Sequence, residues 1–327
     1  MMDDDEIERV SLVRSYLQLL RLPNIFTAMA DAAMGLLFIE ADWAWNDAGG
    51  LRPLGLWALG VIVAASSLLY AGGVVLNDVC DVDLDRNERP DRPIPSGRIL
   101  LRTATGLAGL LLGLGVLLTW LVPLCGGSAH GGVLEQCRPG LIGTLLAGCI
   151  VLYDTYLKRT WLGPVGMGAC RSLNVLLGMS VLVGPFHAEH WLVAGAIGTY
   201  IMGLTWLARN EAEESDRRQL LAAALVMLAG IGLLAGLPQM SSRLLENKPE
   251  HWYLLMTLLG AMIGWRCVWA VIEPTPVRVQ IAVANGIMSL VILDAAACLA
   301  ARDIHWAVVI LAFLLPAMFL GRFLKST

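Results

Sequence analysis

An asparagine and four aspartates close an apolar stretch, and basic residues follow them at once. The segment VVLNDVCDVDLDRNERPDRPIPSGRIL contains the pattern NDxxDxxxD, formed by Asn77, Asp78, Asp81 and Asp85. If the segment is helical, with about 100° of rotation per residue, these four side chains fall within one arc of about 100°. Asp83 then points to the opposite side. One face would therefore carry an amide and three carboxylates.

Clustered carboxylates repel one another unless a positive charge lies between them, and burial near a membrane core makes the repulsion more costly. Hard divalent cations take oxygen ligands, and Mg²⁺ is commonly held by one or two carboxylates together with substrate phosphates. The pattern therefore predicts a Mg²⁺-bridged diphosphate site. Arg92 and Arg98 follow closely and could contact phosphate oxygens directly. The alternative interpretation is a solvated acidic loop.

A second polar patch, LARNEAEESDRR, repeats this arrangement with other residues. As a continuous helix, Asn210, Glu211, Glu214 and Arg218 would take the same relative angles as the first four, in the pattern NExxExxxR. Glutamate also ligates metal, so Glu211 and Glu214 are candidate ligands of an altered second half-site, with Asn210 beside them. The alternative is an ordinary polar helix end.

The composition shows what must position these patches. The 327 residues are 57% hydrophobic and 15% charged, whereas soluble domains carry about 25% charged residues. With a mean hydropathy of +0.67, the chain is expected to be an integral membrane protein. Backbone groups in lipid must bond within each span, so the apolar stretches should be helices. There are ten: 18–39, 54–76, 103–122, 140–157, 163–185, 191–209, 219–238, 251–272, 279–300 and 305–323. The predicted fold is an all-α, multi-pass membrane bundle of nine to ten transmembrane helices.

Lys and Arg residues predict the orientation of these helices. With both chain ends inside, 16 of the 23 basic residues fall on the inside and five on the outside. Both acidic patches would then face the cytoplasm, at the plasma or inner membrane if the chain is bacterial. The first ten residues are acidic and lack an apolar run, so no cleaved signal is expected.

Other polar residues within or beside the spans are candidates for binding: Asn24, Lys158, Arg171 and Asn174. A buried arginine in lipid needs a partner. Two interpretations stay open for Arg171, namely contact with a diphosphate or an ion pair within the bundle. Asp31 lies deeper on the face of Asn24, where a structural role is expected. An Arg266–Asp294 pair also stays open.

These motifs together resemble the UbiA superfamily of intramembrane prenyltransferases. NDxxDxxxD followed by DRPIPSGRI carries most of the resemblance. LLRLPNIFTAMADAAMG is similar to the family's first helix, and LGPVGMGACRSLNVLLG to its fifth. LYDTYLKRT, with Tyr153 and Lys158, is similar to the end of its fourth. The resemblance covers roughly residues 15–220.

The resemblance implies a bundle around a central cavity, in which Mg²⁺ holds a prenyl diphosphate and a lipophilic, often aromatic, acceptor attacks the allylic carbocation. It implies the metal ligands Asn77, Asp78, Asp81, Asp85, Glu211 and Glu214. It implies catalytic roles for Asp78, Asp81, Asp85 and Lys158. It implies substrate contacts from Asn24, Asn77, Arg92, Arg98, Tyr153, Arg171, Asn174 and Asn210. The partners are then the two substrates and the lipid bilayer; no nucleic acid is expected, and the oligomeric state stays open.

The chain departs from the family in its second patch. Family members usually carry aspartate where Glu211, Glu214 and Arg218 stand, and they usually have nine helices. A divergent, non-catalytic membrane protein that binds or carries an amphipathic metabolite is therefore the alternative function. We expect one domain over 1–327, made of two related halves at about 15–160 and 163–300, because both patches end an even-numbered helix.

The shared face gives a first test. Asp83→Ala should retain Mg²⁺-dependent release of diphosphate from a labelled prenyl diphosphate, and Asp81→Ala should lose it, because only Asp81 lies on the face of the other ligands. Assays of the two purified variants beside the unaltered protein measure this. Equal losses in both variants would contradict the assignment of the face.

Overall fold

The structure, a computed structural model, describes residues 4–39, 44–46, 50–125, 132–210, 216–240 and 249–323. Over these residues it is helical, with one isolated bridge between Trp45 and Leu51, so the predicted all-α class is confirmed. The longer helices are α1 (Asp4–Leu19), α2 (Leu22–Phe38), α3 (Pro53–Cys80), α4 (Val82–Glu88), α5 (Leu101–Leu121), α6 (Val133–Thr155), α7 (Gly163–Met179), α8 (Ala188–Leu207), α9 (Arg217–Ala235), α11 (Pro249–Ile272), α12 (Pro276–Ala301), α13 (Ile304–Ala312) and α14 (Leu314–Phe323). The short ones are η1 (Val122–Cys125), η2 (Leu157–Arg159), η3 (Ala208–Asn210) and α10 (Leu237–Met240).

Each of the ten predicted apolar stretches contains a helix. In the described part of the chain, seven stretches are long and apolar enough to cross a membrane. They are α3, α5, α6, α9, α11, α12 and the run Ile304–Arg322 formed by α13 and α14. The chain is therefore a multi-pass membrane protein, while the finer count of nine to ten spans stays a prediction.

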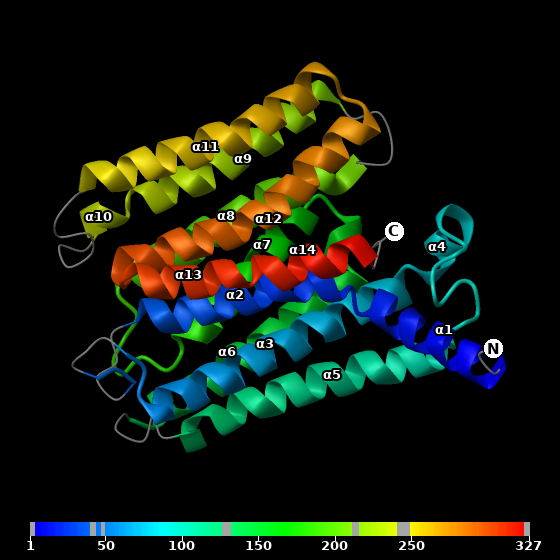
Figure 1. Ribbon diagram of the computed structural model, residues 1–327, viewed down its shortest axis with the longest axis horizontal. Helices are drawn as coiled ribbons and strands as arrows, with labels where there is room; N and C mark the ends of the chain where they lie inside the picture. The colour runs from blue at the N-terminus through cyan, green and yellow to red at the C-terminus, as the bar shows by residue number, and fades with distance from the viewer. Residues whose placement is uncertain are drawn as a thin grey trace.

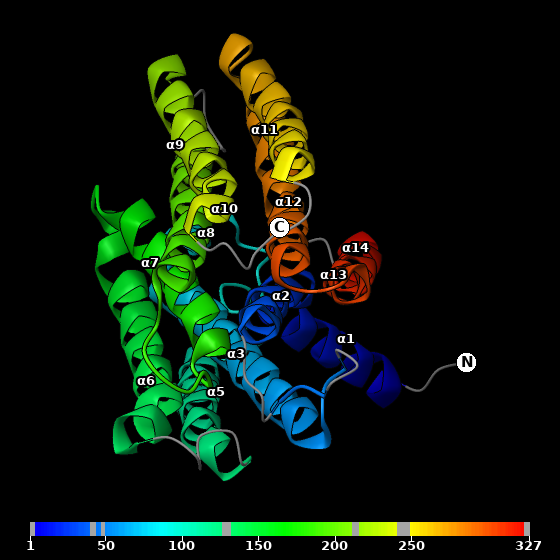
Figure 2. The ribbon, with the colours of Figure 1, turned by 90° about the vertical axis from the view of Figure 1, so that its left-hand side faces the viewer.

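The helices pack as a ring that follows the chain. Contacts run from α2 to α3, from α3 to α6 and from α6 to α7. They continue through α8, α9, α11 and α12, and α12 returns to α2. Figure 1 shows the helices side by side, and Figure 2 views the same bundle from one end. In addition, α2 packs against α7, so two helices that are not neighbours in the order of the ring also touch.

Glycines set the closest of these crossings. A Cβ at Gly35 of α2 would collide with the backbone of α7 at Val175 and Gly178, and a Cβ at Gly178 would collide with the backbone of α2 at Ala32 and Gly35. Small residues let membrane helices approach closely enough for backbone contact. The α2–α7 crossing therefore requires glycine on both sides.

Gly106, Gly109 and Gly113 recur along α5 with a spacing that predicts close helix packing. The structure does not show such packing at these three glycines, so this prediction is wrong. A Cβ at any of the three would meet nothing within 4 Å, since this face of α5 points out of the bundle. Spacing alone does not tell whether a row of small residues faces a partner helix or the surface.

Two alanine substitutions separate packing from helix propensity. Gly178→Ala should lower the free energy of unfolding by about 1–3 kcal/mol, because the added methyl group overpacks the α2–α7 crossing. Gly109→Ala should leave the free energy of unfolding unchanged or raise it by up to about 1 kcal/mol. Both glycines lie within helices, but at Gly109 the added methyl group changes only the helix propensity. Unfolding of both variants in one detergent measures the difference. Equal effects at the two sites would contradict the crossing.

Candidate functional site

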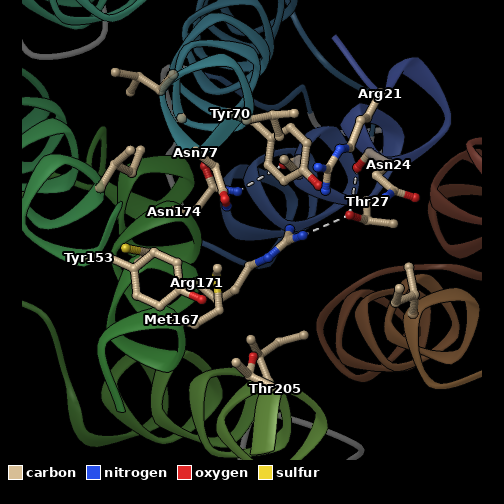
Figure 3. Close-up of a pocket in the computed structure, with 18 of the residues that line it drawn as sticks. Arg21, Asn24, Thr27, Tyr70, Asn77, Tyr153, Met167, Arg171, Asn174 and Thr205 are labelled. Atoms are coloured by element: carbon tan, nitrogen blue, oxygen red, sulfur yellow. Dashed lines mark hydrogen bonds between the residues drawn. The ribbon is translucent and has the colours of Figure 1, made fainter. Parts of the chain in front are cut away.

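A cavity of about 390 Å³ lies inside the ring of helices. Its polar lining residues are Arg21, Asn24, Thr27, Ser66, Tyr70, Asn77, Tyr153, Asp154, Arg171, Asn174 and Thr205. Its apolar walls include Leu69, Leu146, Ile150, Met167, Ile201, Leu204, Val283 and Ile287. Figure 3 shows Asn77 of α3, Tyr153 of α6, and Arg171 and Asn174 of α7 directed toward the same space. The central cavity implied by the family resemblance is therefore present.

The first acidic motif spans the joint between α3 and α4. Asp81 separates the two helices with φ −99° and ψ 6°, and helix-type backbone bonds still bridge the joint. The Asp81 amide donates to the Asn77 carbonyl at 3.0 Å, and the Asp85 amide donates to the Asp81 carbonyl at 2.8 Å. Asp78 and Asp85 are buried, whereas the side chain of Asp83 is 88% exposed. The division of these acids by helical angle is confirmed.

Arg92 lies between the two buried carboxylates of this motif. Its Nη1 is 2.7 Å from Oδ2 of Asp85 and 3.4 Å from Oδ1 of Asp78. Arg21 adds a second cation, with Nη2 at 2.6 Å from the same Asp78 oxygen. The positive charge that clustered carboxylates require is therefore supplied by the chain itself.

Arg21 is a site residue that helical spacing did not predict. It stands between α1 and α2 with φ 44°, a left-handed conformation that non-glycine residues rarely adopt. Local strain of this kind persists only where surrounding contacts hold it, and here the side chain is held by Asp78. Arg21 is the first residue of RLPN, and this sequence, which is part of the family resemblance, could have indicated its role.

Lys158 is the third cation that pairs with the first motif. The chain leaves helix α6 at Thr155, and Lys158 then lies in the short helix η2, with Nζ 2.7 Å from Oδ1 of Asp81. The same Nζ donates to Oδ1 of Asn77 at 3.2 Å. Asp154, which was not among the predicted site residues, is buried and lines the cavity.

A second polar network lies deeper in the cavity wall. Nη1 of Arg171 is 2.6 Å from Oδ2 of Asp31, and Nη2 donates to Oγ1 of Thr27 at 2.8 Å. Asn174 donates to the same Asp31 oxygen at 3.2 Å and accepts from Ser66 at 2.7 Å. The structure thus gives Arg171 the ion pair within the bundle that the sequence left open, and its contact with a diphosphate stays a prediction.

The remaining candidates divide into cavity residues and distant ones. Asn24 and Tyr153 line the cavity. Arg98 does not: it donates to Ser15 at 3.2 Å and to the Asp91 carbonyl, which fastens α1 to the segment after α4. Its predicted phosphate contact gains no support from the cavity lining.

The second motif does not form one helix. α8 ends at Leu207, η3 ends at Asn210, and Asp216 is extended before α9 begins. Oδ1 of Asp216 accepts from the amide of Arg218 at 3.0 Å, so Asp216 caps the start of a new helix. The rotation of about 100° per residue does not continue from Asn210 to Arg218. The prediction that Arg218 shares a helical face with Asn210 is therefore wrong. Glu211 and Glu214 lie outside the described residues.

The oxygens of Asn77, Asp78, Asp81 and Asp85 are of the type that Mg²⁺ prefers. Among the described residues, however, no three His, Cys, Asp or Glu side chains come close enough to hold one metal ion. Each carboxylate of the motif is paired with a basic side chain instead. The oxygen atoms of the motif therefore fit Mg²⁺ as ligands. The basic side chains beside them show that these carboxylates require positive charge close by.

The buried ion pairs predict a difference in stability between two arginines. Arg92→Met should lower the free energy of unfolding by about 3–5 kcal/mol, because it leaves Asp78 and Asp85 buried without their shared cation. Arg86→Met should cost less than about 1 kcal/mol, since the ion-pair partner of Arg86 in the described part of the chain is the exposed Asp83. Chemical unfolding of both variants in detergent measures the difference, and similar losses would contradict the shared role of Arg92.

Comparison with known proteins places this site in a family. Residues 36–285 match the UbiA prenyltransferase family. A digeranylgeranylglyceryl phosphate synthase from Metallosphaera sedula is 35% identical over 178 residues, which are 54% of this chain and 53% of that protein. One from Saccharolobus solfataricus is 36% identical over 188 residues, or 57% of each chain. The chain thus spans about half the length of the curated relatives it matches.

Solved structures agree on the fold. A UbiA homolog from Archaeoglobus fulgidus bound to GPP and Mg²⁺ superposes with a TM-score of 0.66 at 14% identity, over 91% of this chain and 99% of that one. A structure of digeranylgeranylglyceryl phosphate synthase superposes with a TM-score of 0.60 at 19% identity, over 89% of this chain and 99% of that one. With a family match over most of its length and the same fold, the chain belongs to the UbiA prenyltransferase family.

Proposed function

We propose that the protein transfers a prenyl group from a prenyl diphosphate to a lipophilic acceptor within the membrane. The observation that supports this most directly is the two-sided character of the cavity. Its lining includes Asn77 of the acidic motif and Arg21, which pairs with Asp78, while most of the remaining wall is apolar. A ligand with an anionic head and a hydrocarbon tail matches both surfaces.

The head would lie beside Arg21, Asn77 and Lys158. Arg21 and Asn77 line the cavity, and Lys158 contacts Asn77. A diphosphate competes with the carboxylates for these cations, because charge-assisted bonds to phosphate oxygens are about as strong as those to carboxylates. Mg²⁺ held by Asn77, Asp78, Asp81 and Asp85 would supply the charge that neutralises the leaving diphosphate. In this proposal, the carboxylates that form ion pairs in the structure would also bind Mg²⁺ when the diphosphate is present.

The tail would lie against Leu146, Ile150, Ile201, Val283 and Ile287. Such walls exclude water, which protects a reactive allylic cation from hydrolysis. Tyr153 and Tyr70 add aromatic faces to the same lining, and cations are attracted to such faces. The chain's own contribution is therefore to bind the head, align the tail and keep the reacting carbon dry.

The acceptor is the open part of this proposal. The relatives are named for the synthesis of digeranylgeranylglyceryl phosphate, which favours a glyceryl phosphate lipid as acceptor. The family resemblance implied a lipophilic acceptor that is often aromatic. Both classes carry a polar group on a lipophilic body and suit the same cavity, so the assay should offer both.

One observation favours a second function, in which the protein binds or carries an amphipathic metabolite without chemistry. Each carboxylate of the first motif already has a basic partner, and the second motif has glutamates in place of the usual aspartates. Flux of a prenyl diphosphate across proteoliposomes without release of diphosphate would support this function and contradict the enzyme.

Two neighbouring basic residues test the enzyme. Lys158→Met should lower kcat/KM for a prenyl diphosphate by about 100-fold, as loss of one preorganised electrostatic contact does. Arg159→Met should change it by less than about threefold, because Arg159 is exposed and, among the described residues, donates to the backbone carbonyl of Cys80 rather than to the acidic motif. Labelled prenyl diphosphates of several lengths, with Mg²⁺ and both acceptor classes, provide the assay.

The control for this assay is the same reaction with the metal chelated. The proposal is overturned if the unaltered protein releases no diphosphate and binds no prenyl diphosphate under any of these conditions. Equal losses in Lys158→Met and Arg159→Met would remove Lys158 from the site while leaving the reaction class intact.

A further inference from the structure

Two carboxyl groups lie completely buried where α2 and α12 pack together. Asp31 of α2 and Asp294 of α12 are each 0% exposed. The two helices are in contact, and the carboxyl of Asp294 is within hydrogen-bonding reach of Asp31. The Arg266–Asp294 pair that the sequence left open is not formed, since Arg266 is exposed on α11. Asp294 instead belongs to the network behind the cavity wall.

Three of the four carboxyl oxygens of this pair lack a hydrogen-bond donor. Oδ2 of Asp31 accepts from Arg171 and Asn174. Oδ1 of Asp31 and both oxygens of Asp294 are buried and have no donor. A buried oxygen without a donor is costly, and buried polar atoms are nearly always satisfied. A hydrogen between the two carboxyl groups would supply the missing donor.

The charges lead to the same conclusion. The charged and titratable groups around the pair are Arg171 of α7, Tyr70 of α3 and Cys298 of α12. The guanidinium of Arg171 lies 5.3 Å from the ring centre of Tyr70. One guanidinium cannot neutralise two carboxylates in contact, and a second negative charge in this apolar surrounding is strongly disfavoured. One carboxyl must therefore be neutral for the cluster to be balanced.

We propose that Asp31 and Asp294 share one proton, and that Asp294 is thereby a positioning residue for the cavity. The neutral Asp294 donates to Oδ1 of Asp31, and Asp31 stays an anion that holds Arg171. Arg171, which also bonds Thr27, is a polar part of the cavity wall. This places a proton-holding site behind the cavity, and its effect on substrate binding rests on the proposed function.

The shared proton is tested first without turnover, by infrared difference spectroscopy of the protein in lipid. The unaltered protein should show the carbonyl band of a protonated carboxylic acid that is absent from both Asp294→Asn and Asp31→Asn. In the first variant Asp31 remains ionised beside Arg171, and in the second Asp294 takes over as the anion. Asp83→Asn, an exposed site, is the control and should keep the band.

The outcomes are distinct. A band that survives in Asp31→Asn would mean that Asp294 is protonated by burial alone, and the absence of any such band in the unaltered protein would mean that no proton is held; either overturns the proposal. Because the measurement needs no substrate, it decides this point even if the protein proves not to be a prenyltransferase.

Kinetics then test the positioning role. Asp294→Asn can still donate to Asp31, so the KM for a prenyl diphosphate should stay within about threefold of its normal value. Asp294→Leu leaves Oδ1 of Asp31 without a donor, so KM should rise by at least about tenfold, with a smaller change in kcat. Thermal unfolding of both variants verifies that they are folded. A rise in KM in Asp294→Asn equal to that in Asp294→Leu would overturn the positioning role.

Discussion

Two carboxylates of the first acidic motif are buried, and the need to neutralise them is the constraint on which the surrounding helices depend. Asp78 and Asp85 are almost inaccessible, and a buried carboxylate is strongly destabilising unless a cation pairs with it, as Arg21 does with Asp78 and Arg92 does with Asp85. These cations come from separate segments, so satisfying the charge also fixes the segments. Arg21 ties the junction of α1 and α2 to α3, and Arg92 ties the chain after α4 to both α3 and α4.

Another buried carboxylate, deeper in the bundle, is also paired with a cation. Asp31, Arg171 and Asn174 form a network that joins α2 to α7, and Ser66 extends it to α3. Hydrogen bonds in a medium of low dielectric constant are strong when complete and costly when broken. The network therefore holds three helices in a defined arrangement, and that arrangement shapes the cavity wall.

Close packing makes this network possible. Gly35 follows Asp31 by one turn, and Gly178 follows Asn174 by one turn. Their contact brings the backbones of α2 and α7 together, which lets Asn174 reach Asp31 at 3.2 Å. A larger side chain at either glycine would separate the helices and lengthen these bonds. The polar site and the apolar packing are thus parts of one crossing.

The sequence by itself determined the features that depend on local rules. Backbone groups in lipid must bond within their own helix, so hydropathy was enough to find the helices of the bundle. The helical repeat was enough to separate the buried Asp78 and Asp85 from the exposed Asp83. The family followed from the first motif, and the match over residues 36–285 confirms it. The same repeat failed at the second motif, because Asp216 caps a new helix and spacing carries no sign of that interruption.

Only the tertiary structure decided which charges meet. Arg21 reaches Asp78 across 57 residues, and Lys158 pairs with Asp81 although Asp154 stands nearer in the sequence. The contact of Asp31 with Asp294 joins opposite ends of the chain. Ion-pair energy depends on distance in space, and distance in space is set by how the ring of helices closes, which no local pattern encodes. The residue types and their faces could therefore be predicted, whereas their partners could not.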